Sequence, residues 1–171
     1  MPAYVALLRA VNVGGTGKLP MADLKAMCVE AGFDQVQTYI ASGNVVFTHP
    51  GDAGAVKTAL EARLQAYAGK PVGVLVRTAA EMAEVLRANP FPDVAPNRAV
   101  AIFLDQPPPD DAVSGARHCR NERIVAGARE IYVAYDDGMA ASKLVIPAGR
   151  DGTARNMNSV AKLAELAACL A

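Results

Sequence analysis

The order of apolar runs and helical repeats in the first ninety residues is the feature that most constrains the fold of this chain. Apolar residues spaced three and four apart predict one helix that begins at Pro20 and another that begins after Asp52. Compact apolar runs predict strands before, between and after these helices, over residues 4–9, 36–41, 44–48 and 72–77. The resulting order, β-α-β-β-α-β, is typical of the ferredoxin-like unit, an antiparallel sheet with both helices on one face.

A third helix and then a break follow this unit. Thr78 and Glu81 have the spacing of a capping box, in which a hydroxyl and a carboxylate satisfy backbone donors at a helix start. Prolines at positions 90, 92 and 96 are compatible with neither a helix nor a central strand. We therefore expect the link between two lobes there, with an amino-terminal lobe over residues 1–90 and a carboxy-terminal lobe over 91–171.

The second half of the chain repeats the first more loosely. Its pattern predicts a strand, a short helix and a hairpin, over residues 98–104, 110–117 and 123–135 respectively. A last helix follows, with Asn156 or Asn158 as its cap. The expected fold is therefore α+β, with two packed ferredoxin-like lobes of the βαββαβ type and mainly antiparallel sheets.

The composition excludes several classes of protein. The 171 residues are 52% hydrophobic and 20% charged, which excludes a disordered chain. Basic and acidic residues number 17 each, and this balance argues against avid nucleic-acid binding, which needs surplus cation to displace counterions. Three widely spaced cysteines without a C-x-x-C pair suit a reducing compartment. No signal-peptide pattern and no run of about 20 apolar residues is present, so we expect a cytoplasmic protein without a membrane partner.

The glycine-rich segment after the first strand is a candidate anion site. It follows a strand and precedes a helix, as phosphate-binding loops do, but it matches neither Walker A nor the Rossmann pattern. Backbone N–H groups around Gly14, the ammonium group of Lys18 and the positive end of the next helix would attract an anion together. A purely structural turn stays open as the alternative.

A second polar stretch, Thr153, Arg155 and Asn156, is expected at the mouth of the last helix. An arginine there is unfavourable for the helix dipole, so it indicates either a carboxylate partner inside the protein or an anionic ligand. Lys143, in a small polar pair with Ser142, is open to the same two interpretations.

No motif assigns a reaction or a cofactor. Ser159 and Lys162 have S-x-x-K spacing, but the other motifs of that enzyme class are missing, and serine is common in a first helical turn. His49 and His118 lack metal-ligand spacing, so we expect neither a metal site nor a Ser-His triad. Whether the protein is an enzyme stays open at this point.

Five blocks of sequence carry a family resemblance, at residues 7–15, 38–47, 131–133, 142–144 and 152–156. In this order and spacing the chain resembles the bacterial proteins of the DUF1697 family, a domain of unknown function, over nearly its whole length. It departs from the family pattern at Ala10, Met157 and Ser159, where glycine, tryptophan and threonine are usual. The family has no established activity, so the resemblance implies a fold and a set of site positions without a reaction.

The leading hypothesis is a protein that binds a small ligand, bearing a phosphate or a carboxylate, in a cleft between the lobes. Family positions and the glycine-rich segment supply the candidate ligand-binding residues, which are Arg9, Asn12, Gly14, Lys18, Ser42, Asn44, Lys143, Arg155 and Asn156. One alternative is an interaction module that forms a homodimer or docks a partner through a sheet edge. Weak single-stranded RNA binding is a further alternative, with one aromatic in residues 43–47 where RNA-recognition motifs place several.

Overall fold

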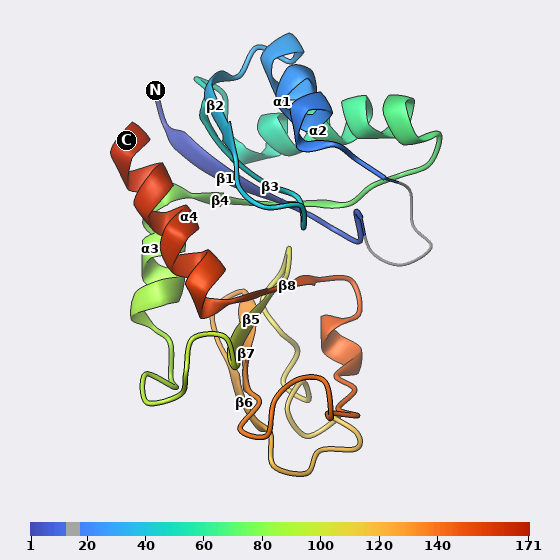
Figure 1. Ribbon diagram of the computed structural model, residues 1–171, viewed down its shortest axis with the longest axis vertical. Coiled ribbons are helices and arrows are strands. Elements are labelled where there is room, and N and C mark those ends of the chain that lie inside the picture. Colours follow the sequence, from blue (N-terminus) through green and yellow to red (C-terminus); the bar gives the residue numbers. More distant parts are fainter. Residues whose placement is uncertain (13–17) are drawn as a thin grey trace. The chain divides into compact units, whose positions relative to one another are not determined.

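The computed structural model describes residues 1–12 and 18–171 of the chain. They form two compact units, one of Met1–Ala83 with Lys162–Ala171 and the other of Glu84–Ala161. The described residues hold four α-helices and two four-stranded antiparallel sheets, so the protein has the α+β fold that the sequence predicts (Figure 1). None of the described helices is long and apolar enough to cross a membrane.

The first unit has the expected order of elements. It contains β1 (Ala3–Leu8), α1 (Met21–Glu30), β2 (Asp34–Thr38), β3 (Asn44–Thr48), α2 (Ala53–Ala68) and β4 (Val74–Thr78). The strands lie in the order β2-β3-β1-β4, and each neighbouring pair is antiparallel. Figure 1 shows α1 and α2 on the same side of this sheet. The ferredoxin-like arrangement expected of the first half is therefore confirmed.

Local signals place both crossover helices where the sequence predicts them. The helix α1 begins directly after Pro20, whose ring fixes a backbone angle suited to a helix start. The helix α2 is capped by Asp52, whose Oδ1 accepts a hydrogen bond from the Ala55 backbone N at 2.8 Å. These two residues therefore mark where each helix begins.

The side of the sheet that faces these helices forms the core of the first unit. Alternate residues of β1 point toward the helices, as the period of two in a strand requires. They pack against buried side chains of both helices, and the set includes Tyr4, Ala6, Leu8, Leu24, Cys28, Val56, Leu60 and Leu64. Phe33 stacks on Phe47 of β3, with the ring centroids 4.2 Å apart.

The opposite side of the same sheet is also mainly apolar. Val5, Leu7 and Leu75 alternate with the core residues along their strands, and each is at most 1% exposed. Arg77 pairs with Val5 across the sheet and is equally buried. The side of the sheet away from α1 and α2 therefore carries aliphatic residues together with the arginine.

A capping box starts the helix that follows the first sheet, α3 (Ala79–Arg87). The Glu81 backbone N donates to Thr78 Oγ1 at 3.1 Å, and the Thr78 backbone N donates to Glu81 Oε1 at 2.9 Å. This reciprocal pair satisfies two backbone donors at the helix start, as the sequence predicts.

The second unit repeats the strand order of the first. Its strands are β5 (Ala99–Phe103), β6 (Arg123–Ala126), β7 (Glu130–Ala134) and β8 (Thr153–Asn156), in the order β6-β7-β5-β8, and α4 (Met157–Leu170) follows them. The pairing registers correspond as well, since Leu7 faces Asn44 in the first sheet and Phe103 faces Glu130 in the second.

The connections of the second unit differ from the sequence prediction. The prediction of a short helix over residues 110–117 is wrong, because most of these residues form turns. In one of the turns the Gly115 backbone N donates to the Asp111 carbonyl. Prolines at 107–109 and the glycine at 115 disfavour an α-helix in this segment. Between β7 and β8 the chain forms only a short 3₁₀ helix, η1 (Pro147–Gly149), so turns take the place of both crossover helices.

Candidate functional site

The site residues expected from the sequence divide between the two units. Arg9, Asn12, Lys18, Ser42 and Asn44 belong to the first unit, and Lys143, Arg155 and Asn156 belong to the second. Gly14 lies outside the described residues. The convergence of both groups on one cleft stays a prediction.

Asn12 joins three parts of the first unit through its carboxamide. Its backbone has a φ of 55°, in the left-handed region that asparagine tolerates better than most residues. Its Nδ2 donates to the carbonyl oxygens of Leu19 and Ala41, each at 2.8 Å. Its Oδ1 accepts from the Leu19 backbone N at 2.6 Å. Asn12 therefore positions the start of α1 against the turn that precedes β3.

The turn between β2 and β3 is held by Asn44. This residue is fully buried, and its Nδ2 donates to the Tyr39 carbonyl at 2.8 Å and to Ser42 Oγ at 3.0 Å. The Leu8 backbone N donates to the Gly43 carbonyl at 2.9 Å, which attaches the turn to the end of β1. Ser42 and Asn44 are thus brought together, and their contacts stabilise the hairpin.

Arg9 lies beside the segment that leads into β4. Its backbone N donates to the Gly73 carbonyl at 2.9 Å. A Cβ atom on residue 73 would stand 2.9 Å from Arg9 Cδ, so the glycine leaves room for the half-buried arginine side chain. This contact gives Arg9 a packing role at the end of β1.

A pocket of about 250 Å³ lies in the first unit between the chain that precedes α1 and the end of α2. Its lining consists of Ala10, Val11, Lys18, Leu19, Leu64, Tyr67, Ala68, Lys70 and Val72. Val11, Leu19 and Leu64 are also members of the buried core, so the floor of the pocket is continuous with that core. Lys18 and Lys70 are exposed and are the charged residues of the described lining. The pocket therefore combines an apolar floor with a cationic rim.

Tyr67 closes one side of this pocket from the last turn of α2. Its hydroxyl donates to Asp23 Oδ2 in the first turn of α1 at 2.8 Å. The hydrogen bond to this carboxylate, which weakens when the phenol ionises, raises the pKa of Tyr67. The phenol therefore stays neutral at physiological pH, and its proton is directed at Asp23.

Arg155 lies next to the mouth of the last helix, as the sequence predicts, but it is buried. It belongs to β8, pairs with Ala101 of β5 and stands two residues before the first residue of α4. It is 7% exposed, and its Nη1 donates to Thr153 Oγ1 at 2.7 Å and to the Ala154 carbonyl at 2.9 Å. Burial lowers the pKa of its guanidinium to about 10. These contacts favour a structural role in the strand that leads into α4.

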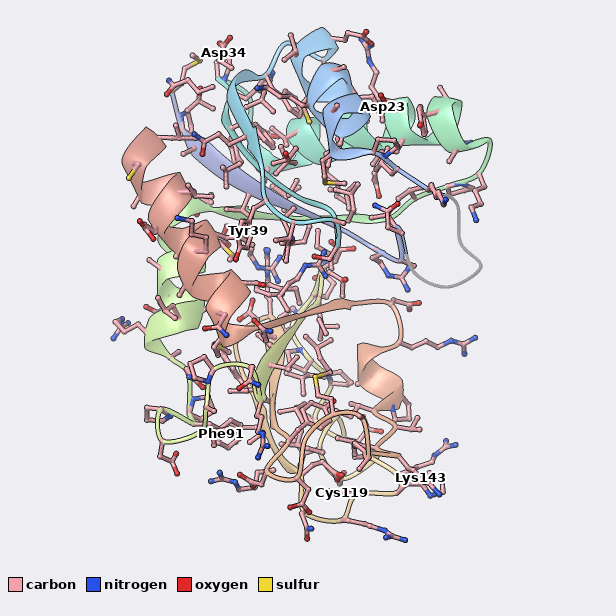
Figure 2. All side chains as sticks on the ribbon, viewed as in Figure 1. Asp23, Asp34, Tyr39, Phe91, Cys119 and Lys143 are labelled. Carbon is pink, nitrogen blue, oxygen red and sulfur yellow. The ribbon has the colours of Figure 1, made fainter. Side chains whose placement is uncertain are left out.

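Asn156 and Lys143 have different surroundings in the second unit. Asn156 Oδ1 accepts from the Ser159 backbone N at 3.0 Å, so Asn156 caps α4. Lys143 is exposed and projects from the chain (Figure 2). Its neighbour Ser142 donates from Oγ to Glu122 Oε1 at 3.1 Å.

The second unit has a smaller and more polar pocket of about 160 Å³. Glu122, Asp136 and Asp137 line it together with Arg120. The Arg120 backbone N–H donates to Glu122 Oε2 at 3.0 Å and lowers the pKa of that carboxyl. Among the described residues no group of three or more potential ligand side chains is arranged to hold a metal ion.

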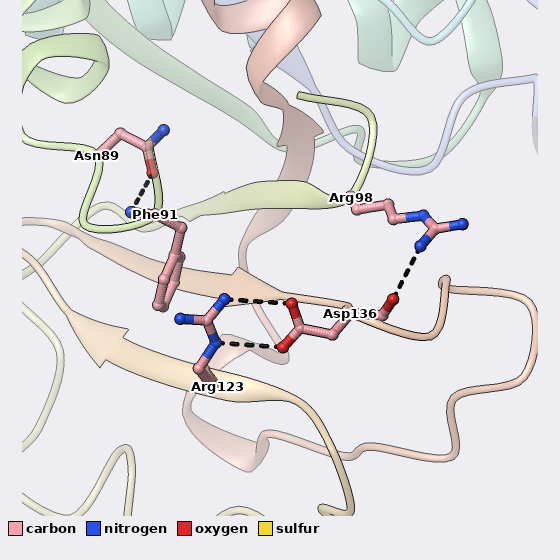
Figure 3. A network of polar contacts seen from close by, with 5 residues as sticks. All are labelled: Asn89, Phe91, Arg98, Arg123 and Asp136. Atoms are coloured by element: carbon pink, nitrogen blue, oxygen red, sulfur yellow. Dashed lines mark hydrogen bonds and ion pairs between the residues drawn. The ribbon is translucent and has the colours of Figure 1, made fainter. Parts of the chain in front are cut away.

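An ion pair beside this pocket ties β6 to the chain after β7. Arg123 donates to both carboxylate oxygens of Asp136, at 3.1 Å each (Figure 3). The same guanidinium lies 5.0 Å from the ring centroid of Phe91, which adds a cation–π contact. Arg98 donates to the Asp136 backbone carbonyl at 2.8 Å. The Asp136 carboxylate is therefore already matched by a cation within the unit.

Sequence reasoning identified Lys18 but missed the rest of the pocket. Tyr67 and Lys70 carry no motif, since they resemble the ordinary exposed end of a helix. The one sequence feature that points to this part of the pocket is the glycine at 69, which marks the end of α2. The chain turns there, so Lys70 and Val72 lie on the way back to the sheet.

The fold and the pocket define a two-unit α+β protein with a candidate small-ligand site. The chain belongs to the family described as protein of unknown function (DUF1697), whose model matches residues 1–132. The sequence blocks at 142–144 and 152–156 lie beyond this match. Its fold is similar to that of conserved bacterial protein SP0830 from Streptococcus pneumoniae, with a TM-score of 0.79 and 22% sequence identity over 97% of this chain and 98% of that chain. This likeness bears on the fold alone. No curated protein matches the chain.

Proposed function

We propose that this protein binds a small organic anion in the pocket between the chain that precedes α1 and the end of α2. The observation that carries the proposal is the pairing of two rim lysines, Lys18 and Lys70, with a floor of core side chains. Carboxylate and phosphate groups are the natural partners of ammonium groups, and an apolar floor accepts the rest of a ligand. The described lining contains no carboxylate, and the Asp23 carboxylate beside it accepts a hydrogen bond from the Tyr67 hydroxyl.

The magnitudes favour an organic anion over an inorganic one. Each exposed lysine contributes about 1 kcal/mol or less to an ion pair in water. Burial of apolar ligand surface adds about 25 cal/mol per Å². An inorganic anion has only the first contribution, so it binds weakly, and useful affinity requires contact with the floor.

Two alternative functions, RNA binding and homodimer formation, lead to different expectations. RNA binding on a ferredoxin-like sheet uses aromatic side chains for base stacking, whereas Val5, Leu7 and Leu75, on the side away from α1 and α2, are aliphatic. A homodimeric interaction module would reveal itself as a molecular mass that rises with protein concentration.

Thermal unfolding and calorimetric titration with phosphate, benzoate and octanoate test the proposal. At least one organic anion is expected to raise the melting temperature saturably, by mass action on the folded state. Lys18→Ala and Lys70→Ala should each weaken its binding about twofold to fivefold. Lys25→Ala removes an exposed lysine of α1 that does not line the pocket, and it should bind like the parent protein. If no anion binds, or if Lys25→Ala weakens binding as much as the rim variants do, the proposal is rejected.

A further inference from the structure

We infer that the anion is an amphiphilic organic acid, with one acidic head and an unbranched or aromatic apolar body, and not a polar phosphate ester such as a nucleotide. This inference rests on the proposed function and specifies the chemistry of its ligand. It follows from the apolar floor of the pocket and from the hydrogen bonds that several described polar groups beside it already make.

The floor of the pocket offers a ligand only apolar contacts. Val11, Leu19 and Leu64 are 5%, 4% and 1% exposed. All three belong to the hydrophobic core of the first unit. Val72 packs against the same core. A ligand body that carries hydroxyl groups or ring nitrogens would lose its hydrogen bonds to water there without replacement, which is costly. An alkyl or aryl body loses nothing of this kind.

Several described polar groups beside the floor already make hydrogen bonds within the protein. Both backbone polar atoms of Leu19 bond to the Asn12 carboxamide, at 2.6 and 2.8 Å. The Tyr67 hydroxyl directs its proton to Asp23, and the backbone N of Gly69 donates to the Gln65 carbonyl at 2.9 Å. Recognition of a nucleobase or a sugar needs several such donors and acceptors. Among the described lining residues the charged side chains are those of Lys18 and Lys70, whose two ammonium groups suit a single acidic head.

The size of the pocket agrees with a short acid. Its volume of about 250 Å³ lies just below the range of about 300 to 1,000 Å³ that is typical of pockets for drug-sized ligands. Each buried methylene is worth about 0.8 kcal/mol, which is about fourfold in affinity. Affinity should therefore rise with chain length until the pocket is filled.

Calorimetric titration of the whole protein with butanoate, hexanoate and octanoate tests the inference, with octanol, phosphate and adenosine monophosphate as comparison ligands. We expect affinity to rise about twofold to fourfold per methylene. Octanol, which has the tail without the charge, should bind about fivefold or more weakly than octanoate. Adenosine monophosphate should bind no better than phosphate.

A pair of variants locates the binding in the pocket. Ala68 and Ala66 are both exposed residues of α2, but only Ala68 lines the pocket. Ala68→Phe should occupy the pocket and remove the dependence on chain length, whereas Ala66→Phe should leave it intact. Equal effects of the two variants would overturn the assignment to this pocket.

The outcomes separate this inference from the proposed function. If phosphate or adenosine monophosphate binds more tightly than octanoate and depends on Lys18 and Lys70, the anion site stands and the amphiphilic ligand is overturned. If octanol binds as tightly as octanoate, the role of the lysines is overturned. If none of the ligands binds, both proposals are rejected together.

Discussion

Asn12 and Leu19 are joined by two hydrogen bonds that use both backbone polar atoms of the leucine. Asn12 Nδ2 donates to the Leu19 carbonyl at 2.8 Å, and the Leu19 backbone N donates to Asn12 Oδ1 at 2.6 Å. A third bond, to the Ala41 carbonyl, fixes the same carboxamide to the turn before β3. Since Lys18 precedes Leu19 and both line the pocket, Asn12 acts as a positioning residue for that pocket.

The first prediction concerns the donor side of this carboxamide. Asn12→Asp keeps the size and the acceptor but places a carboxylate oxygen against two carbonyl oxygens. We expect the free energy of unfolding to fall by about 1 to 3 kcal/mol. Asn158→Asp is a suitable control, because Asn158 is exposed in the first turn of α4, where a negative charge is favourable. Urea denaturation of both variants checks this, and equal effects would contradict the role of Asn12.

The second prediction compares two glycines with nearly equal backbone angles, Gly43 with a φ of +91° and Gly32 with a φ of +87°. A Cβ at residue 43 would meet Val11 Cγ2 at 2.6 Å and Leu8 Cβ at 2.9 Å, while a Cβ at residue 32 meets nothing within 4 Å. Gly32→Ala should therefore cost about 1 kcal/mol from backbone strain alone. Gly43→Ala adds an overpacked contact and should cost about 3 kcal/mol.

The same denaturation experiment measures both glycine variants. If the two alanine variants lose equal stability, the close approach of the turn to the end of β1 does not contribute, and only the positive φ matters. A larger loss for Gly43→Ala supports the packing of residues 41–44 on that strand.

Local sequence patterns predicted the first unit well because its signals are strong and short in range. The caps at Asp52 and Thr78 and the four-residue spacing of Val56, Leu60 and Leu64 each fix an element without help from distant residues. The strand β8 could not be predicted in this way. Its sequence, from Thr153 to Asn156, shows no alternation, and its extended form depends on pairing with β5, some fifty residues earlier.

The candidate site was predictable only in part, because it too depends on residues that are distant in the sequence. Lys18 stands out beside a glycine-rich segment, but the apolar floor and Lys70 come from the end of α2, which is brought there by the fold and by no motif. Asn12 and Asn44 drew attention as possible ligand-binding amides. Their hydrogen bonds to backbone carbonyls give them structural roles, which a single sequence does not distinguish from ligand binding.

The third prediction concerns Arg155. Its removal would leave the Thr153 hydroxyl and the Ala154 carbonyl without the buried donor that they share. We expect Arg155→Ala to reduce the free energy of unfolding by about 3 kcal/mol. Arg87→Ala is the matched control, since Arg87 pairs with Glu84 on an exposed surface and should cost about 0.5 kcal/mol or less. A loss below about 1 kcal/mol for Arg155→Ala would instead return Arg155 to the candidate ligand-binding residues.

The last prediction concerns the three cysteines, of which Cys28 is buried and Cys119 and Cys169 are exposed. Burial of Cys28 in the core beneath α1 raises the pKa of its thiol to about 12. The thiolate is the reactive form, so at pH 8 a thiol reagent should modify two cysteines rapidly and the third only after denaturant is added.

The same shift makes stability depend on pH. The folded state retains the Cys28 proton that the unfolded chain releases above its ordinary pKa of 9.0. Between about pH 9 and 12 the folded state therefore binds more protons, and the free energy of unfolding falls as the pH rises. Cys28→Ala lacks this contribution, so its stability should fall less over the same range. Three rapidly reacting thiols at pH 8, or parallel pH curves for the two proteins, would show that Cys28 is accessible to solvent.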